Sequence, residues 1–489
     1  MTFMRYRRKT MTTDPRASSM ERATFWLSVS VLVVSQILCN GPDGIAGSVI
    51  AQTGLLLLSI ALLATCTASL RGMRLSGADR LLAILLSGIV LLAMIQLVPL
   101  PPAVWKSLAG RSGLSVEMQT IGVGIGWRPI SLSPVASERC LLALLPAIAI
   151  FLAARSMSKT GRKRLVQGVV ALGLISALLG IAQVGNGPDS DLRLYRPSNL
   201  SDAIGFFANR NHYGSMLAML LPFSISWTFH EFQRRGESGR AGMIRILLSC
   251  LVTFLFVIGI LLSHSRAGLL LTAIAGLGSM ALLWRSGAGG RIILAVGICG
   301  ILGGILALEI AGNDVVSRLT ALDLGSDTRW PVQATTIDAV HRYGAFGSGL
   351  GTFVSAYQSV APDYQIDQNA YVNHANNDYL ELLLEAGWPA AVLIAGFFAW
   401  YGWEAIPLWR AGRLPTSELM MARAASLSIL LALVHAGLEY QLRKPAIMVL
   451  FGLCCALLSA QARRSGKGDP GPRLDDAIRQ HTQRPTSSD

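Results

Sequence analysis

The stretch NHANNDYLELLLEAGWPAAVLIAGFFAWYGW, residues 373–403, joins a polar cluster directly to a long apolar segment. Its first six residues include a histidine, three asparagines and an aspartate. Asp378 and Glu381 have the spacing of a capping box, which predicts that Asp378 caps the start of a helix. The apolar run from Ala390 to Trp403 is long enough to enter a bilayer. The sequence therefore predicts a polar site just outside a membrane-entering helix.

The composition is that of a polytopic membrane protein. The chain has 489 residues, of which 52% are hydrophobic and only 14% are charged. The formal charge of +14 does not indicate nucleic-acid binding, because Lys and Arg occur in short clusters between apolar runs, as in cytoplasmic loops. The seven cysteines lie in or beside apolar segments without a CxxC pair, which predicts small buried side chains rather than disulfides or metal ligands.

Twelve apolar runs are each close to the ~20 residues that a bilayer core requires. The first follows a basic start and resembles a signal peptide, but the eleven later runs favour an uncleaved span. We therefore expect an all-α fold of about twelve transmembrane helices. The predicted spans are 23–39, 45–70, 80–98, 138–156, 164–184, 212–230, 243–262, 267–284, 290–310, 386–403, 421–440 and 445–461.

The distribution of positive charge predicts the orientation of these spans. With the N-terminus inside, most of the 42 Lys and Arg residues fall in the even-numbered connections and the two tails. Both termini are then cytoplasmic, and the connection between the ninth and tenth spans is a long periplasmic loop. The predicted organisation is a basic N-terminus (1–22), a membrane domain (23–461) that contains the loop (313–385), and a disordered cytoplasmic tail (462–489).

Several short motifs carry little weight. Asp189 and Asp191 match the DxD pattern of metal-dependent glycosyltransferases, but two neighbouring loop acids are usually only solvated. GSGLGTF, residues 347–353, lacks the lysine of a P-loop and is interpreted as a flexible turn. The sequence contains no GxSxG, HExxH or paired-cysteine motif, so it does not indicate one of the common hydrolases or zinc proteases.

Polar residues gather at the predicted outer ends of the helices, and two of them are the strongest candidates for chemistry. Arg266 follows a very short turn, so it either extends to the membrane surface as a helix-end arginine or binds an anion such as phosphate. His374 is either a surface histidine or a proton acceptor near neutral pH. Asp378 is fully explained by helix capping. Asn209 to His212 either cap the sixth span, with Asn211 as the N-cap, or bind a ligand.

These residues, in this order and on this side, resemble the O-antigen ligase and polymerase superfamily of bacterial envelope enzymes. The resemblance covers most of the membrane domain. It rests on five motifs: SLSPVASERCLLALL, GFFANRNHYGSML, SHSRAGLLL, GSGLGTF and NHANNDYLELLLEAGWPA. The last motif is the most specific.

The resemblance implies a GT-C-like membrane fold in which a long periplasmic loop covers the active site. It also implies a glycan donor on undecaprenyl pyrophosphate and catalysis without a metal or another cofactor. The functional histidine of the family falls on His374, and its arginine in the SR turn falls on Arg266. A further family arginine precedes the sixth span and is Arg193, Arg196 or Arg210. The residues expected to bind pyrophosphate or glycan are Arg193, Arg196, Asn209, Arg210, Asn211, His212, Arg266, Asn377 and Tyr379.

The chemistry also agrees with these residue types. A neutral histidine can accept the proton of an acceptor hydroxyl, and fixed arginines can stabilise the departing pyrophosphate. The sequence before the sixth span, NRNH, favours a polymerase of O-antigen or exopolysaccharide in the inner membrane. The alternatives are a ligase that transfers the glycan to lipid A–core or to protein, and, from another class, a transporter of the lipid-linked glycan. The transporter is disfavoured because the polar residues lie at one face and not along a path through the membrane.

Overall fold

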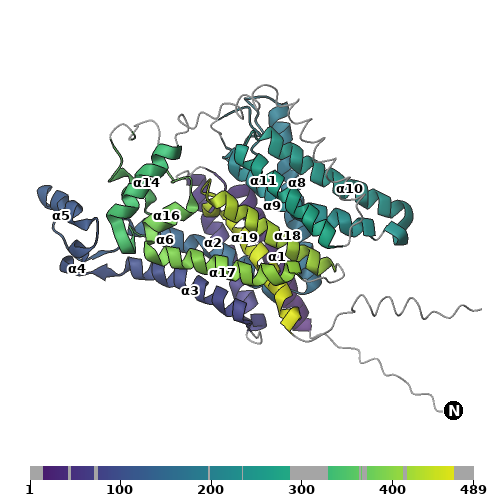
Figure 1. The fold of residues 1–489 in the computed structure, drawn as a ribbon, viewed down its shortest axis with the longest axis horizontal. Helices are drawn as coiled ribbons and strands as arrows, with labels where there is room; N and C mark the ends of the chain where they lie inside the picture. The colour runs from purple at the N-terminus through teal and green to yellow at the C-terminus, as the bar shows by residue number, and fades with distance from the viewer. Residues whose placement is uncertain are drawn as a thin grey trace, which may run out of the picture.

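The computed structural model of the protein describes residues 15–41, 46–70, 75–195, 199–233, 235–286, 329–362, 365, 372–410 and 416–466. In these residues the chain is almost entirely helical, with long helices packed side by side and a smaller group of helices at one end (Figure 1). The expected all-α polytopic fold is confirmed. A two-residue antiparallel pair, in which Pro99 is opposite Pro129, is the one sheet in the described residues.

The described helices and strands follow a single order along the chain. They are α1 (Pro15–Leu38), α2 (Ala46–Leu70), α3 (Gly77–Leu97), β1 (Pro99–Leu100), α4 (Pro102–Ser107), α5 (Arg111–Thr120), β2 (Arg128–Pro129), α6 (Pro134–Ala143), α7 (Leu145–Ser156), α8 (Lys159–Gly185), α9 (Arg210–Gln233), α10 (Arg235–Leu262), α11 (Arg266–Arg285), α14 (Arg329–Tyr343), η1 (Gly344–Phe346), α15 (Phe353–Gln358), α16 (Asp378–Ala386), α17 (Trp388–Arg410), α18 (Ser417–Ala436), η3 (Gln441–Arg443) and α19 (Pro445–Gly466).

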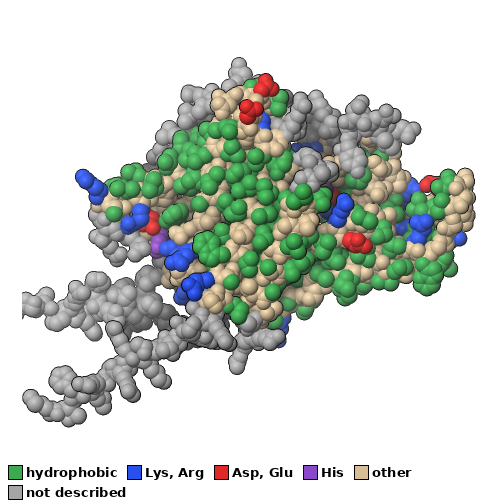
Figure 2. All heavy atoms as spheres, turned by 180° about the vertical axis from the view of Figure 1, so that it is seen from behind, with side chains coloured by type: hydrophobic (Ala, Val, Ile, Leu, Met, Phe, Trp, Pro, Cys, Tyr) green, Lys and Arg blue, Asp and Glu red, His purple; other side chains and the backbone are tan. Residues whose placement is uncertain are grey.

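Nine helical segments in the described residues are long and apolar enough to cross a membrane. They are α1, α2, α3, α6 with α7, α8, α10, α11, α17 and α18. The predicted sixth span is the buried helix α9, and the predicted twelfth is α19, whose apolar part is shorter. The predicted ninth span, 290–310, lies outside the described residues. Figure 2 shows one broad face of apolar side chains with few charges, as expected for a surface in contact with lipid.

Helices α9, α18 and α19 form the centre of the bundle. Helix α9 contacts α8, α10, α11 and α18, and α18 also contacts α19. Small residues allow some of these helices to approach closely. A Cβ on Gly259 of α10 would lie 2.6 Å from the hydroxyl of Tyr213 in α9. Close approach at small residues is a common way to pack membrane helices, because lipid provides no hydrophobic drive between them.

The helix ends that were predicted to be outer meet at one end of the bundle. The N–H of Ala208, just before α9, donates to the carbonyl of Asn40 at the end of α1 (3.1 Å). The N–H of Ala203 donates to the carbonyl of Leu262 at the end of α10 (2.9 Å). The side chain of Gln36 in α1 donates to the carbonyl of Ala446 at the start of α19 (2.9 Å). The polar segments between these ends are therefore gathered on one face.

Helices α14, α15 and α16 form a small layer at this end with an apolar core of their own. The predicted amphipathic helix at 328–342 is α14, which packs against α15 and α16. The GSGLGTF segment is a tightly fitted turn, contrary to the interpretation as a flexible one. Gly349 has a φ of 110°, and a Cβ there would lie 2.5 Å from Cα of Ser131. Its N–H donates to the carbonyl of Glu385 in α16 (2.9 Å), so the glycines permit close backbone packing.

Candidate active site

His374 lies directly before α16, and its ring is fixed on two sides. Nδ1 is 2.9 Å from Oε1 of Glu381, one turn into the helix. The ring stacks on Tyr440, with centroids 3.9 Å apart and planes at 23°. The ring of Phe353 lies nearly parallel at 6.5 Å. His374 is therefore a half-buried group with a defined orientation and not a mobile surface histidine.

The start of α16 differs from the predicted capping box. The N-cap is Asn377, whose Oδ1 accepts hydrogen bonds from the N–H groups of Tyr379 (3.1 Å) and Leu380 (3.0 Å). Asp378 is the first helical residue, and its Oδ2 accepts from the N–H of Leu442 (3.0 Å). The prediction that Asp378 caps this helix is wrong, because asparagine one position earlier already satisfies the free N–H groups of the first turn.

Glu381 does not act in a capping box either. Its Oε2 accepts from the N–H of Ala375 (2.9 Å), and its Oε1 faces both His374 and the Nε of Arg443 (3.0 Å). The helix end is capped by Asn377 without it. The Glu381 carboxylate therefore serves His374 and the preceding loop.

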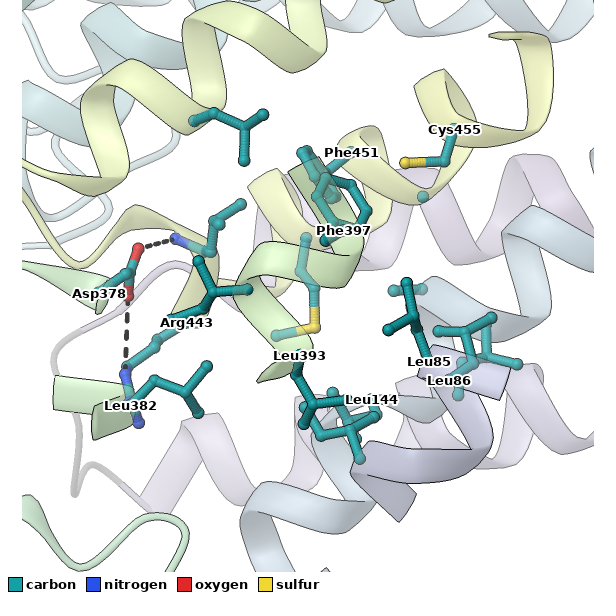
Figure 3. Close-up of a pocket in the computed structure, with 18 of the residues that line it drawn as sticks. Leu85, Leu86, Leu144, Asp378, Leu382, Leu393, Phe397, Arg443, Phe451 and Cys455 are labelled. Carbon is teal, nitrogen blue, oxygen red and sulfur yellow. Dashed lines mark hydrogen bonds and ion pairs between the residues drawn. The ribbon is translucent and has the colours of Figure 1, made fainter. Parts of the chain in front are cut away.

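Arg443 in η3 pairs with three carboxylates on one face of α16. It lies 2.9 Å from Glu385, 3.0 Å from Glu381 and 3.6 Å from Asp378. The positions 378, 381 and 385 fall on a single side of a helix because they are three and four residues apart. Figure 3 shows Arg443 reaching toward Asp378 from the opposite segment. This single guanidinium cannot neutralise all three acids.

Burial and the positive charge of Arg443 shift the pKa values of these three acids in opposite directions. Burial raises the pKa of Asp378 to about 7, although Arg443 acts against the shift. Burial together with the charge of Glu381 also raises the pKa of Glu385. Burial alone would raise the pKa of Glu381, but Arg443 and His374 hold it below its usual value. Glu381 is thus the member of the cluster that stays ionised.

A second polar cluster surrounds Asp202, a buried residue in the segment before α9. Its Oδ2 lies 2.6 Å from Nη1 of Arg210, and its Oδ1 lies 2.9 Å from Nδ1 of His264. His264 has a φ of 49°, which is unusual for a residue other than glycine. Asp202 therefore ties the start of α9 to the short turn between α10 and α11.

A series of hydrogen bonds and ion pairs between side chains extends from this turn to the start of α14. Ser265 donates to Oδ1 of Asn211 (2.7 Å), and Nδ2 of Asn211 donates to Oε1 of Glu439 (2.7 Å). The same carboxylate oxygen lies 3.3 Å from Nη2 of Arg329 at the start of α14. Arg266 follows Ser265 directly in the sequence. The series therefore runs from Ser265, the residue before Arg266, to Arg329.

Tyr440 joins the two clusters into one site. His212 at the start of α9 contacts one side of the Tyr440 ring edge-on, with centroids 4.9 Å apart, while His374 stacks on the ring. Glu439 and Arg443, which belong to different clusters, lie one position before and three positions after Tyr440. The segment between α18 and α19 is therefore the centre of the candidate active site.

The predicted arginines are not equivalent in this site. Arg266 is exposed and has no ion-pair partner among the described residues. Arg210 is half-buried and already paired with Asp202. Arg193 donates to the backbone carbonyls of Asp202 (2.9 Å) and Leu200, so it holds the loop in shape. Arg196 lies outside the described residues. Among the predicted arginines that the structure describes, Arg266 is the most accessible to an anion.

The remaining predicted binding residues mostly support the framework of the site. Asn209 accepts from the N–H of Asn211 (2.7 Å) and precedes α9, so the helix is capped at Asn209 and the alternative with Asn211 as N-cap is wrong. Tyr379 donates its hydroxyl to the carbonyl of Leu433 in α18 (2.6 Å). Asn377 caps α16. In the first turn of α9, Arg210 contacts Asp202, Asn211 contacts Glu439, and His212 contacts Tyr440.

An apolar cavity of about 330 Å³ lies between α3, α6, α7, α17 and α19. Its walls include Leu86, Leu144, Leu393 and Phe451, as Figure 3 shows. At one end the lining changes to the polar cluster around Arg443. The cavity therefore connects an apolar space among membrane-spanning helices with the residues that hold His374.

Sequence reasoning missed five residues of this site and placed a sixth in the wrong role. Asp202, Arg329, Glu385, Tyr440 and Arg443 were not singled out, and Glu381 was interpreted only as part of a cap. Acids at positions 378, 381 and 385 gave one usable signal, because three acids on one face of an apolar helix need a buried partner. The partner itself lies more than fifty residues away and could not be identified from spacing.

The described residues contain no group of three or more His, Cys, Asp or Glu side chains that could hold a metal ion. Asp189 and Asp191 are exposed. Of the seven cysteines, none of the six that the structure describes forms a disulfide.

Comparison with known families gives one match. Residues 251–395 are similar to the family model described as O-Antigen ligase. This segment contains Arg266, Arg329, His374 and Glu381, whereas Asp202 lies outside it. The match confirms the family resemblance that the sequence motifs indicate. A comparison with curated proteins finds no match.

Proposed function

Because residues 251–395 place this chain in the O-antigen ligase and polymerase superfamily, we propose that it transfers a glycan from undecaprenyl pyrophosphate to a sugar acceptor. The chain is a multi-pass bacterial membrane protein of polysaccharide biosynthesis. Within the family, we propose that it acts as a polymerase of O-antigen or exopolysaccharide and that its active site is on the periplasmic side. The observation that carries the proposal is the oriented pair of His374 and Glu381 within the matched segment.

His374 is the proposed general base. The acceptor hydroxyl attacks the anomeric carbon of the donor sugar, and its proton passes to Nε2 of His374 as the new carbon–oxygen bond forms. The bond between the anomeric carbon and the pyrophosphate oxygen breaks, and the electron pair leaves with undecaprenyl pyrophosphate. The hydrogen bond from Nδ1–H to Glu381 leaves the lone pair on Nε2, which is the form a base requires.

Positive side chains are proposed to stabilise the leaving pyrophosphate. Arg266 presents an exposed guanidinium, and a planar guanidinium can hold two phosphate oxygens at once. Arg210 and Arg329 are partly exposed and are paired with Asp202 and Glu439, so they add positive charge while being held in place. We propose that these arginines take the role a metal has in other glycosyltransferases. Treatment with EDTA should then leave transfer intact, and a loss that magnesium or manganese restores would contradict this role.

The apolar cavity is proposed to hold part of the polyprenyl chain of the donor. Much of its lining comes from α3, α6 with α7, and α17, which are long and apolar enough to cross the membrane, and its polar end lies beside Arg443. An isoprenoid chain suits such a lining because burial of apolar surface is favourable by about 25 cal/mol per Å². The donor would then enter from the bilayer with its sugar directed toward His374.

The glycans of a strain that lacks this chain test the function. A polymerase predicts accumulation of single repeat units on the polyprenyl carrier and loss of long surface polysaccharide. A ligase, acting on lipid A–core or on protein, predicts accumulation of long chains on the carrier instead. Re-expression of the unchanged chain should restore the normal profile, and re-expression of His374→Ala should not. A normal profile in the deletion strain would refute both activities.

A further inference from the structure

Glu381 has a set of contacts that helix capping does not explain. Its carboxylate is fully buried, and both oxygens are used: one accepts from the N–H of Ala375, and the other faces His374 and Arg443. A buried carboxylate is costly unless it is paired and hydrogen-bonded. The partners of the Glu381 carboxylate include Nδ1 of His374, the proposed base.

We propose that Glu381 is the positioning residue for His374 and that Arg443 in turn holds the Glu381 carboxylate. The inference rests on the proposed function, because it assumes that His374 is the base. Glu381 selects the tautomer with the proton on Nδ1, fixes the ring, and stabilises the imidazolium that forms when the acceptor proton is taken. This is the arrangement in which a carboxylate orients a catalytic histidine, here supplied by a helix and its preceding loop.

The stacking on Tyr440 supports this role. A hydrogen bond at Nδ1 leaves the ring free to rotate about the bond axis, but a face contact at 3.9 Å between centroids sets its plane. Glu381 and Tyr440 together define both the position and the plane of the ring. Nε2 then points in a fixed direction, as proton transfer at hydrogen-bond distance requires.

The contacts of Glu381 also explain why it stays ionised although it is buried together with Asp378 and Glu385. Arg443 contributes one positive charge, and the nearby acids Asp378 and Glu385 have raised pKa values. Glu381 has in addition the N–H of Ala375 and the His374 ring as partners, which favour its charged form. The titratable or charged groups that surround His374 directly or through its neighbours are Glu381, Asp378 and Glu385 on α16, Arg443 on η3, and Tyr440, Lys444 and His212 beside the stacked ring.

The experiment is the pH profile of transfer by purified protein in liposomes. The substrate is the polyprenyl-linked material extracted from the deletion strain, which serves as donor and as acceptor. A carboxylate beside an imidazole shifts its pKa by ~1–3 units toward the charged form. In Glu381→Gln the carboxylate is lost, the base becomes weaker, and the acidic limb of kcat/KM should move to lower pH by about one unit or more. The value of kcat should fall by about 10²-fold to 10⁴-fold, because base assistance has that size.

Two variants separate positioning from folding. Glu381→Asp keeps the charge at a shorter reach, so kcat should fall while the acidic limb stays near that of the unchanged protein. Glu385→Gln removes an acid from the same helix and the same arginine but does not contact His374, so its acidic limb should also stay in place. Thermal unfolding of each variant in the same liposomes shows whether the fold is retained.

Two results would overturn the inference. An unchanged acidic limb and near-normal kcat in Glu381→Gln, while His374→Ala is inactive, would refute positioning by Glu381 and leave the proposed function standing. An equal displacement of the limb in Glu385→Gln would show that the whole acidic cluster, and not the contact of Glu381 with His374, sets the basicity. Activity in His374→Ala would instead refute the base on which the proposed function depends.

Discussion

At the scale of single residues, the partners of each charged side chain decide what it can do. Arg443 is committed to three carboxylates and Arg193 to two backbone carbonyls, so neither has a guanidinium available for a phosphate. Arg266 has no ion pair among the described residues and is exposed. Residue type alone does not make this distinction.

Arg266→Lys should lose transfer nearly as completely as Arg266→Ala. Lysine keeps the charge but not the planar group that holds two phosphate oxygens. The measurement is transfer by membranes that contain equal amounts of each variant. Arg164→Lys, at an exposed position near the opposite end of the bundle, is the matched control and should be normal. Normal transfer by the Arg266→Lys protein would mean that Arg266 only ends a helix at the membrane surface.

Asp378→Asn should retain transfer, because an asparagine oxygen can still accept from the N–H of Leu442. It should also change the pH dependence of stability. The Asp378 pKa is about 7, above its ordinary value, so the folded protein binds more protons than the unfolded chain between about pH 4 and pH 7. Stability should therefore fall as pH rises through this range, and less steeply in Asp378→Asn.

The measurement for this variant is the thermal midpoint in detergent from pH 5 to pH 8. An identical slope in both proteins would show that another group carries the pH dependence. An inactive Asp378→Asn protein that remains folded would point to Asp378, and not His374, as the base.

At the scale of elements, short polar segments between long helices carry the site. Helix α16 presents three acids to η3, the turn before α11 presents His264, and the segment after α18 presents Glu439 and Tyr440. The long helices hold these segments together and provide the apolar cavity beside them. Changes inside the cavity should therefore affect the donor more than the acceptor.

Leu393→Trp tests the cavity on α17. Leu393 lines it, so a larger side chain should occupy the space proposed for the polyprenyl chain and raise the KM for the donor several-fold, with a smaller effect on kcat. Val392→Trp is the matched control, because Val392 is the neighbouring position, is 69% exposed and is not part of the lining. Equal KM values for the two variants would exclude the cavity as the lipid site.

At the scale of the whole molecule, the site lies where the predicted outer helix ends meet. The ends of α1, α9, α10 and α19 and the segment after α18 are joined there by backbone and side-chain hydrogen bonds. The distribution of Lys and Arg predicts that this end faces the periplasm and that both termini face the cytoplasm.

Reporter fusions test this orientation. A reporter that is active only in the periplasm should be inactive when it is joined after Arg464 and active when it is inserted after Gln358, at the end of α15. A cytoplasmic reporter should give the opposite pattern. Periplasmic activity after Arg464 would reverse the predicted topology and place the active site inside the cell.

The sequence by itself determined the membrane class, most of the helices, the gathering of polar residues at one end, and His374 and Arg266 as candidates. These properties depend on local composition and on the length of apolar runs, which a bilayer constrains strongly. Capping was predicted less well, since Asn377 and not Asp378 caps α16. Asn377 and Asp378 are both residue types that cap helices, and the local spacing does not show which of them caps α16.

Only the tertiary structure decided how the candidate residues are paired. Arg443 meets Glu381 and Glu385 across about sixty residues of sequence, and Asn211 meets Glu439 across 228. Such contacts depend on which helices pack together, and no local pattern contains that information. They nevertheless determine the chemistry, because the same histidine or arginine is a base, an anion ligand or a structural brace according to the charge placed beside it.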